Sequence, residues 1–314
     1  MRVGALTAGV GVPQAEFSGC VAEVHASASL VELADGTLLT LLSRELGAQP
    51  HGISLDVPTG FSFQPMLLRG GALAARAGVL RISESALVVD LRGVRPWRSN
   101  LEAILVDFRK TTVQEAWRVA WVMLKADGRS EQLVRLAGIR IAALEAATRR
   151  ADARAARHAM GGLIGLGPGR TPAGDDFLVG YLAGLKISAT GGPNDPFVPT
   201  LLSNLKELNL RTNRLSRLYL DDAADGEISE RLRDVAMAIA AGAASAGVRR
   251  ALAAALAVGH CSGAAAVLGL LRGSAAGSEV QSEADAAPSG KASTTLPACS
   301  PRSANPKQIT PSSR

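Results

Sequence analysis

The chain has 314 residues, of which 47% are hydrophobic and 4% aromatic, so it can bury a core of mainly Ala, Leu and Val in one large domain or two. Its formal net charge of +6 is modest, and nucleic-acid-binding proteins usually add a dense basic stripe with interleaved aromatic residues. The nearest candidate, residues 147–158, has the pattern of a solvated Ala/Arg helix face. We therefore expect no nucleic-acid partner. No run approaches the ~20 apolar residues of a membrane span, so we expect no membrane partner either.

Three cysteines lie far apart and show no metal-ligand spacing: Cys20, Cys261 and Cys299. An odd number without a disulfide framework is typical of a reducing compartment. The stretch before Cys20 does not resemble a lipoprotein signal, because it has one basic residue and its apolar part is interrupted by Pro13 and Glu16. We expect a cytoplasmic protein.

The first part of the chain, residues 1–95, has the short, punctuated apolar segments of β-structure. An Asp35-Gly36 pair between two apolar runs predicts a hairpin turn. His25 and His51 stand alone, so we expect each to be a hydrogen-bonded or surface histidine rather than a catalyst. The expected strands are residues 20–25, 29–33, 38–42, 52–57, 79–82 and 86–90, and residues 67–77 are either a strand or a loop.

From residue 96 the apolar residues follow helical spacing. Ser99 and Glu102 have the spacing of a capping box, which predicts a helix start there, a break near residues 110–112 and an end at Asp127-Gly128. A second helix is expected from residue 130 to about residue 160. Three or four further helices are expected between residues 201 and 273, with breaks near residues 209, 225–226, 247 and 259. The sequence thus predicts an α+β protein, with a β-rich N-terminal part followed by a mainly α-helical part at residues 96–273.

The composition shifts once more after Gly273. Residues 274–314 are rich in Ser, Ala and Pro and nearly devoid of large apolar side chains. Such a segment buries too little surface to offset its chain entropy, so we expect a disordered tail.

The most informative stretch reads GLGPGRTPAGDDFLVG at residues 165–180. It begins as a glycine-rich loop and becomes a helix, with Thr171 as the expected N-cap and Pro172 at the first helical position. Gly180 and Gly184 leave room for a neighbouring helix to come close. No Gly-Lys-Ser/Thr follows the glycines, so the stretch is not a P-loop, and it lacks the glycine spacing of a dinucleotide fingerprint.

A helix N-terminus beneath a glycine loop favours an anion, because unpaired N–H groups and the positive end of the helix dipole attract phosphate or carboxylate. Asp175 and Asp176, beside Arg170, restrict which anion can bind, because two carboxylates would repel an anion that carries no other group. Either the ligand also carries N–H donors, or a divalent cation such as Mg²⁺ bridges carboxylate and phosphate. The alternative is structural: a tight turn and a capped helix whose carboxylates balance the dipole. The sequence leaves that alternative, and the cofactor, open.

Other polar residues follow further along the chain. Thr212 and Ser216 are four residues apart, so on a helix they share one face. Ser262 is a natural N-cap for the helix after the Gly259 turn. The imidazole of His260 suits general acid or base catalysis, and a plain loop histidine is the alternative. Residues 221–222 are two aspartates at an expected helix end, where we expect both carboxylates to be solvated, and a role in ligand binding is the alternative.

Taken whole, the glycine motif resembles the signature of the DUF2877 family, which includes the AllH subunit of oxamate carbamoyltransferase. Two downstream segments are similar to further family motifs: RTNRLS at residues 211–216 and GHCSG at residues 259–263. The resemblance covers roughly residues 17–273 and is strongest from Gly161 onwards. The chain departs from the family pattern at Arg170, at Ala173 and at the alanines of positions 264–265. These departures make the substrate harder to predict than the fold.

The resemblance implies an enzyme subunit that acts with other carbamoyltransferase subunits and phosphorolyses oxalurate to oxamate and carbamoyl phosphate during purine (allantoin) breakdown. The alternative function is a non-catalytic subunit that binds a small phosphorylated or carboxylated metabolite and organises a partner enzyme. If the family's site carries over, the catalytic candidates are Asp175, Asp176 and His260. The binding candidates are Gly167, Gly169, Arg170, Thr171, Gly174, Thr212, Ser216, Ser262 and Gly263.

Overall fold

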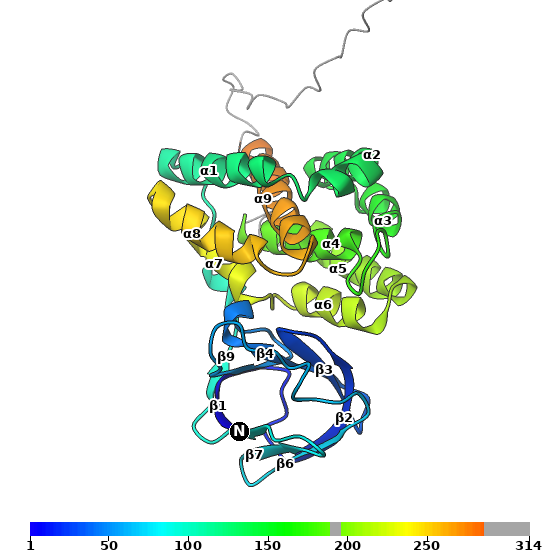
Figure 1. The fold of residues 1–314 in the computed structure, drawn as a ribbon. Helices are drawn as coiled ribbons and strands as arrows, with labels where there is room; N and C mark the ends of the chain where they lie inside the picture. The colour runs from blue at the N-terminus through cyan, green and yellow to red at the C-terminus, as the bar shows by residue number, and fades with distance from the viewer. Residues whose placement is uncertain (189–195, 286–314) are drawn as a thin grey trace, which may run out of the picture.

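The computed structural model describes residues 1–188 and 196–285. It confirms the expected α+β class, because a mixed eight-stranded β-barrel precedes a helical part. Figure 1 shows the barrel at one end of the molecule and the helices stacked above it.

The strands that form the barrel are β1 (Arg2–Gly9), β2 (Phe17–Val24), β3 (Ala28–Leu33), β4 (Leu38–Ser43), β5 (Gly52–Leu55), β6 (Ala72–Arg76), β7 (Val79–Ile82) and β8 (Val88–Asp90). The short strand β9 (Arg95–Trp97) lies outside the closed ring and pairs with β1. The order around the barrel is β5, β4, β3, β2, β6, β7, β8, β1, and an antiparallel β1–β5 pairing closes it. The β4–β5 and β1–β8 pairs are parallel. A separate apolar cluster that includes Val31, Leu41 and Ile53 forms the core of this part.

The expected strands are present with shifted ends, and the predicted hairpin is confirmed. β3 and β4 pair antiparallel, Gly36 has a φ of +86° at the turn, and the Asp35 carboxylate accepts the Thr37 amide at 2.9 Å. No strand is predicted at β1, because its sequence RVGALTAG is rich in Ala and Gly, which have weak strand propensity. β9 pairs with β1, so the β part extends past the predicted boundary at residue 95 to Trp97.

The described residues of the second part contain the helices α1 (Thr111–Asp127), α2 (Glu131–Arg149), α3 (Ala153–Gly161), α4 (Ala173–Ile187), α5 (Phe197–Leu208), α6 (Arg214–Ala224), α7 (Glu230–Ala240), α8 (Ser245–Leu256) and α9 (Ser262–Asp285). Their apolar faces form one large cluster, in which α4 is buried along almost its whole length. Within residues 1–188 and 196–285, no helix is both long enough and apolar enough to cross a membrane.

The helix predicted to start at Ser99 begins later, at Thr111. Both capping groups of Ser99 are used in a tertiary contact: its hydroxyl donates to the Gly226 carbonyl at 2.8 Å, and its amide donates to the Glu227 carboxylate at 2.9 Å. Only the short 3-10 helix Leu101–Ala103 follows. The predicted end is confirmed, since the residue after α1 is a glycine in the left-handed conformation at position 128.

The single helix predicted from residue 130 to about residue 160 is two helices, α2 and α3. Ala151 separates them with a φ of +49°, a conformation that no α-helix contains. The Asp152 side chain then caps α3 by accepting the Ala155 amide. The break is a local backbone event that the helical spacing of apolar residues does not reveal.

The later helices also differ from the prediction. Five helices, α5 to α9, occupy the region where three or four were expected. The break expected near Gly247 lies at Gly242, which has a φ of +56°. α9 continues past Gly273 to Asp285, so the first part of the predicted disordered tail is helical, with Ser274 and Ala276 buried. Residues 286–314, the rest of that predicted tail, lie outside the described residues.

The backbones of α4 and α9 are in contact where the two helices cross, and glycines permit this approach. A Cβ atom at Gly180 would lie 1.8 Å from the Ala266 carbonyl oxygen. From the other helix, a Cβ at Gly269 would lie 2.0 Å from the Phe177 carbonyl oxygen. The room predicted at Gly180 and Gly184 is therefore occupied by α9, which gains packing along its length.

Polar contacts join the barrel to α6 and α7. The Glu230 carboxylate accepts the Ala48 amide at 2.8 Å, and the Glu230 amide donates to the Ala48 carbonyl at 2.9 Å. Arg214 pairs with Glu32 of β3 at 3.0 Å. These contacts hold the barrel against the helical part.

We expect Gly180→Ala to lower the free energy of unfolding by about 3 kcal/mol or more, because the added Cβ forces two helices apart. Gly138→Ala is the matched control, since Gly138 is inside α2 with its nearest neighbour, a Val134 methyl carbon, 3.9 Å from the added Cβ. That control is expected to raise stability by up to about 1 kcal/mol through helix propensity. Urea unfolding measures both, and equal effects would contradict the close crossing.

Candidate functional site

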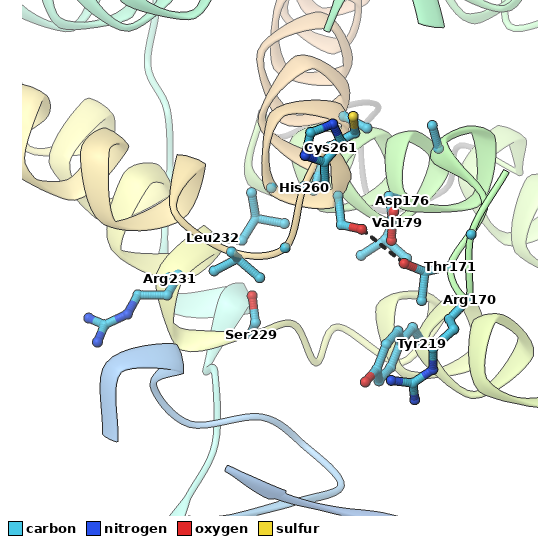
Figure 2. Close-up of a pocket in the computed structure, with 18 of the residues that line it drawn as sticks. Arg170, Thr171, Asp176, Val179, Tyr219, Ser229, Arg231, Leu232, His260 and Cys261 are labelled. Atoms are coloured by element: carbon cyan, nitrogen blue, oxygen red, sulfur yellow. Dashed lines mark hydrogen bonds between the residues drawn. The ribbon is translucent and has the colours of Figure 1, made fainter. Parts of the chain in front are cut away.

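A cavity of about 580 Å³ lies between the barrel and the helical part. Its walls come from β3, β4 and the loop before β5, from the start of α2, from the glycine loop and α4, from α6 and α7, and from the turn between α8 and α9. Figure 2 shows the helical side of this cavity, with Arg170, Thr171 and Asp176 on one side and Leu232 on the other. Thus the cavity contains the predicted loop and residues from distant parts of the chain.

The glycine loop has the unusual backbone that its composition predicts. Gly167 and Gly169 have φ angles of +109° and +107°, which side chains other than glycine rarely adopt. Within the described part of the chain, the amides of Gly167, Gly169, Arg170 and Thr171 donate to no other group. These four N–H groups are available to a ligand at the cavity wall.

Gly174 has a different role from the one expected. Its amide donates to the Leu166 carbonyl at 2.9 Å, so it is already satisfied. A Cβ at this position would lie 2.0 Å from the Leu163 carbonyl oxygen. Gly174 therefore lets the loop pack closely on the first turn of α4, and its amide is already bonded within the chain.

The start of α4 is also arranged differently from the prediction. The helix begins at Ala173, Pro172 occupies the N-cap position, and the Pro172 carbonyl accepts the amides of Asp175 and Asp176 at 2.9 and 3.1 Å. The Thr171 hydroxyl is consequently free of the capping role and lies 2.9 Å from the Ser262 hydroxyl. Ser262 is itself the first residue of α9, so this contact joins the starts of two helices (Figure 2).

Asp175 is a structural residue and is not part of the cavity wall. It is 1% exposed, and its two carboxylate oxygens accept the Gly165 amide at 2.7 Å and the Thr212 hydroxyl at 2.5 Å. This pair of bonds ties the glycine loop to the segment before α6. Asp175 and Thr212 thus make contacts that hold the loop in shape, and both oxygens of the Asp175 carboxylate already have a partner.

Asp176 is the aspartate that faces the cavity. It is 8% exposed, and its Oδ2 atom is buried with no hydrogen-bond partner among the described residues. Burial raises the pKa of this carboxyl to about 7, although the Ser262 and Thr171 hydroxyls beside it lower the pKa. Near neutral pH, Asp176 therefore exists in both protonation states and can donate as well as accept a proton.

Ser216 and Gly263 have structural contacts. α6 begins at Arg214, so Thr212 precedes the helix and the expectation that it shares a helix face with Ser216 is wrong. The Ser216 amide donates to the Asn213 side chain at 3.0 Å, which caps α6, and Ser216 is not part of the cavity wall. Gly263 does border the cavity, but its amide donates to the Val258 carbonyl at 3.1 Å.

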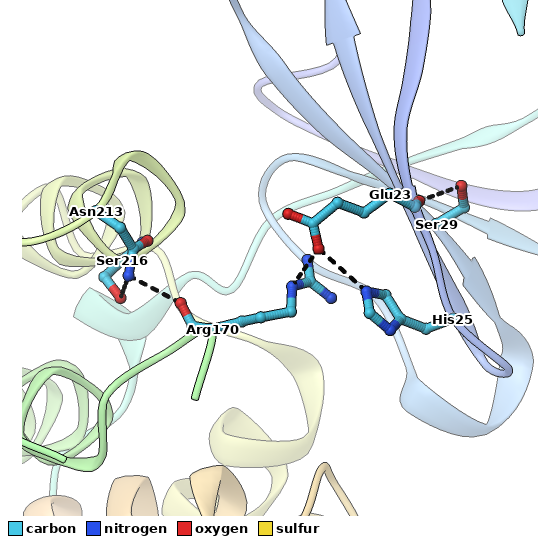
Figure 3. Close-up of polar contacts among 6 residues, drawn as sticks. All are labelled: Glu23, His25, Ser29, Arg170, Asn213 and Ser216. Atoms are coloured by element: carbon cyan, nitrogen blue, oxygen red, sulfur yellow. Dashed lines mark hydrogen bonds and ion pairs between the residues drawn. The ribbon is translucent and has the colours of Figure 1, made fainter. Parts of the chain in front are cut away.

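Arg170 borders the cavity and is already paired with the barrel. Its Nε atom lies 2.7 Å from Glu23 Oε2 on β2, and His25 Nε2 lies 3.2 Å from the same oxygen (Figure 3). Its backbone carbonyl accepts the Asn213 side-chain amide at 2.9 Å. Hence the loop cation has a fixed position, and an incoming anion would share it with Glu23.

His260, unlike His25 and His51, borders the cavity, and these three histidines were the ones singled out in the sequence. His260 is exposed and borders the cavity next to Cys261 (Figure 2). His25 is hydrogen-bonded, as expected of an isolated histidine, and so is His51, whose Nδ1 lies 3.1 Å from Asp222 Oδ2. That contact links the barrel to α6.

Polar residues from outside the sequence motifs also border the cavity, among them Tyr219, Asp222 and Gln49. The Tyr219 hydroxyl donates to Gln49 at 3.3 Å, and burial raises its pKa to about 12. The expectation of a solvated Asp222 is wrong, because the barrel covers it, and this burial raises the pKa of its carboxyl while the His51 hydrogen bond lowers it. Only the docking of the barrel onto α6 brings these residues to the site.

The comparison with family models decides the resemblance. Residues 163–274 match the family model of the oxamate carbamoyltransferase subunit AllH. The predicted resemblance is confirmed for this segment, which we call the AllH segment. It contains the glycine loop and the helices from α4 to α8, together with the first half of α9. No curated protein and no solved structure matches the chain.

Within residues 1–188 and 196–285, no group of three or more His, Cys, Asp or Glu side chains is placed to hold a metal ion. In the AllH segment, the cavity wall has the buried carboxylate of Asp176 next to two hydroxyls, and also the carboxylate of Asp222, which is paired with His51. This arrangement offers hydrogen bonds and one titratable proton to a ligand.

We expect Asp175→Ala to lower the free energy of unfolding by about 2 kcal/mol, because it leaves the Gly165 amide and the Thr212 hydroxyl without their partner. Asp175→Asn is the isosteric control. Its amide oxygen can accept the Gly165 amide and its NH₂ group can donate to Thr212, so a smaller loss is expected. Chemical denaturation compares the two, and equal losses would show that the hydrogen bonds contribute little.

The raised pKa of Asp176 predicts a pH-dependent stability. Between pH 4 and pH 7 the unfolded chain releases this proton while the folded chain keeps it, so the free energy of unfolding falls as pH rises and levels off above pH 7. Asp176→Asn removes this contribution. From pH 5 to pH 8 the variant should therefore gain on the order of 2 kcal/mol relative to the unsubstituted chain. Urea titrations at both pH values measure it, and a constant difference would refute the raised pKa.

Proposed function

We propose that this chain is a subunit of an oxamate carbamoyltransferase-like enzyme, which transfers a carbamoyl group between oxalurate and phosphate. The AllH match over residues 163–274 supports the family of reaction. The single observation that carries the site is the convergence of free loop amides with Asp176, Thr171 and Ser262 at one cavity wall.

In this proposal the loop holds the negative charge of the substrates. The amides of Gly167, Gly169 and Thr171 donate to a phosphate or carboxylate oxygen, and the Arg170 guanidinium adds a charge-assisted bond. The Thr171 and Ser262 hydroxyls complete the set of donors. Because catalysis of carbamoyl transfer depends on positioning and on stabilising charge that develops on oxygen, no covalent nucleophile is needed.

Asp176 carries the proton in this scheme. A phosphate oxygen attacks the carbamoyl carbon, the bond between that carbon and the oxamate nitrogen breaks, and carbamoyl phosphate and oxamate form. The phosphate loses one proton and the departing nitrogen gains one. A carboxyl whose pKa is about 7 can take the first proton and supply the second. His260, on the same cavity wall, is the second candidate for this role.

We also propose that other carbamoyltransferase subunits act together with this chain, since the family description is that of a subunit.

The test combines the purified chain with the products of neighbouring genes, oxalurate and phosphate, and measures carbamoyl phosphate. Asp176→Asn is expected to lower the rate at least about 100-fold, as loss of a general acid-base group does. Asp56→Asn is the control, because Asp56 is an exposed barrel carboxylate away from the cavity and should leave the rate unchanged.

Two outcomes would redirect the assignment. Binding of oxamate or phosphate without turnover in the complete mixture would favour the non-catalytic alternative, a subunit that holds the metabolite for a partner enzyme. A full rate with Asp176→Asn and a large loss with His260→Gln would move the proton transfer to the histidine.

A further inference from the structure

The cavity is larger than the small anions of the proposed reaction need. Its volume of about 580 Å³ falls within the range of pockets that enclose drug-sized ligands, roughly 300–1,000 Å³. The loop amides and the Thr171–Ser262 pair line only one part of it. The rest of the wall has a different chemistry.

Away from the glycine loop, the wall between the barrel and α6–α7 contains a group of leucines, and Asp222, Ser229 and Arg231 also border it. Leu42 of β4 and Leu46 of the 3-10 helix Arg44–Leu46 line it from the barrel. Leu215 of α6 and Leu232 of α7 line it from the helical part. Figure 2 shows Leu232 across the open space from Arg170. The cavity thus has an anion end and an apolar end.

The AllH segment and the barrel contribute differently to the two ends. The loop residues and Asp176 at the anion end lie within the AllH segment at residues 163–274. The apolar end combines Leu215 and Leu232 of that segment with Leu42 and Leu46 of the barrel. The anion end can therefore serve the chemistry that the family name describes, while the barrel helps to decide which molecular body fits beside it. This division is typical of sites at the boundary between two structural parts.

We propose that the ligand of this cavity is an organic anion with an apolar body, whose carboxylate or phosphate binds at residues 167–171 and whose body packs against Leu42, Leu46 and Leu232. The inference rests on the proposed function, an oxamate carbamoyltransferase-like reaction, and refines its substrate class to oxamate-type acids that carry an apolar body. Burial of an apolar body gives affinity in proportion to the area removed from water. The leucines provide such a surface, and the loop fixes the direction of the ligand.

The test is calorimetric titration of the full chain with oxamate and with N-ethyl-, N-butyl- and N-hexyloxamate. These compounds share the carboxylate and differ only in the apolar body. Affinity is expected to rise about fourfold for each methylene that is buried, with a binding heat capacity that becomes more negative along the series. Leu46→Ser should reduce the preference for N-hexyloxamate over oxamate about tenfold, because it removes part of the apolar end.

Leu105→Ser is the matched control, since Leu105 is 53% exposed and lies outside the cavity wall, and it should leave that preference unchanged. Equal affinities for all four compounds would overturn the apolar end while leaving the proposed anion site intact. If Leu46→Ser leaves the preference for N-hexyloxamate over oxamate unchanged, the apolar end is also overturned. Binding of none of the four would instead overturn the anion site, and this inference with it.

Discussion

The contact between the backbones of α4 and α9 sets the geometry on which the rest of the site depends. Two helices approach this closely only where no Cβ stands between them, and Gly180 and Gly269 meet that condition. The crossing brings the first residues of both helices side by side, so that the Thr171 and Ser262 hydroxyls lie 2.9 Å apart. Asp176, one turn into α4, is then buried beside both hydroxyls, and the same burial raises its pKa. Packing and chemistry at this site thus have a common origin in a few small residues.

The barrel contributes directly to the site through its contacts with the helical part. It pairs Glu23 with Arg170, His51 with Asp222 and Ala48 with Glu230, and these contacts fix the distance between its strands and the helices. The cavity exists because this docking leaves space between β4 and the start of α4. A charged loop residue that is held from the opposite wall is oriented before any ligand arrives, which lowers the entropy cost of binding. The site is therefore a property of the two parts together.

The adjacent aspartates show what a sequence motif can and cannot predict about a site. The sequence makes both Asp175 and Asp176 catalytic candidates through the family resemblance, although consecutive residues of a helix point in different directions. In the structure, Asp175 holds Gly165 and Thr212, whereas Asp176 faces the cavity. Which of the two faces the ligand depends on the rotation of α4 about its axis, and α9 and the loop determine that rotation. The capping box at Ser99 failed for a related reason, because Gly226 and Glu227, far along the chain, use the groups that would have capped a local helix.

Local sequence patterns were enough to predict the α+β class, the β3–β4 hairpin at Asp35-Gly36, the end of α1 at Gly128 and the family resemblance of the glycine motif. These features depend on local backbone preferences and on contiguous residue patterns, which a chain carries without reference to its fold. Three features became visible in the folded chain alone: the Gly174 amide is occupied, Arg170 is paired with Glu23, and Asp222 and Tyr219 border the cavity. Each of these facts joins residues distant in sequence, and such contacts depend on how whole elements dock, which local pattern does not encode.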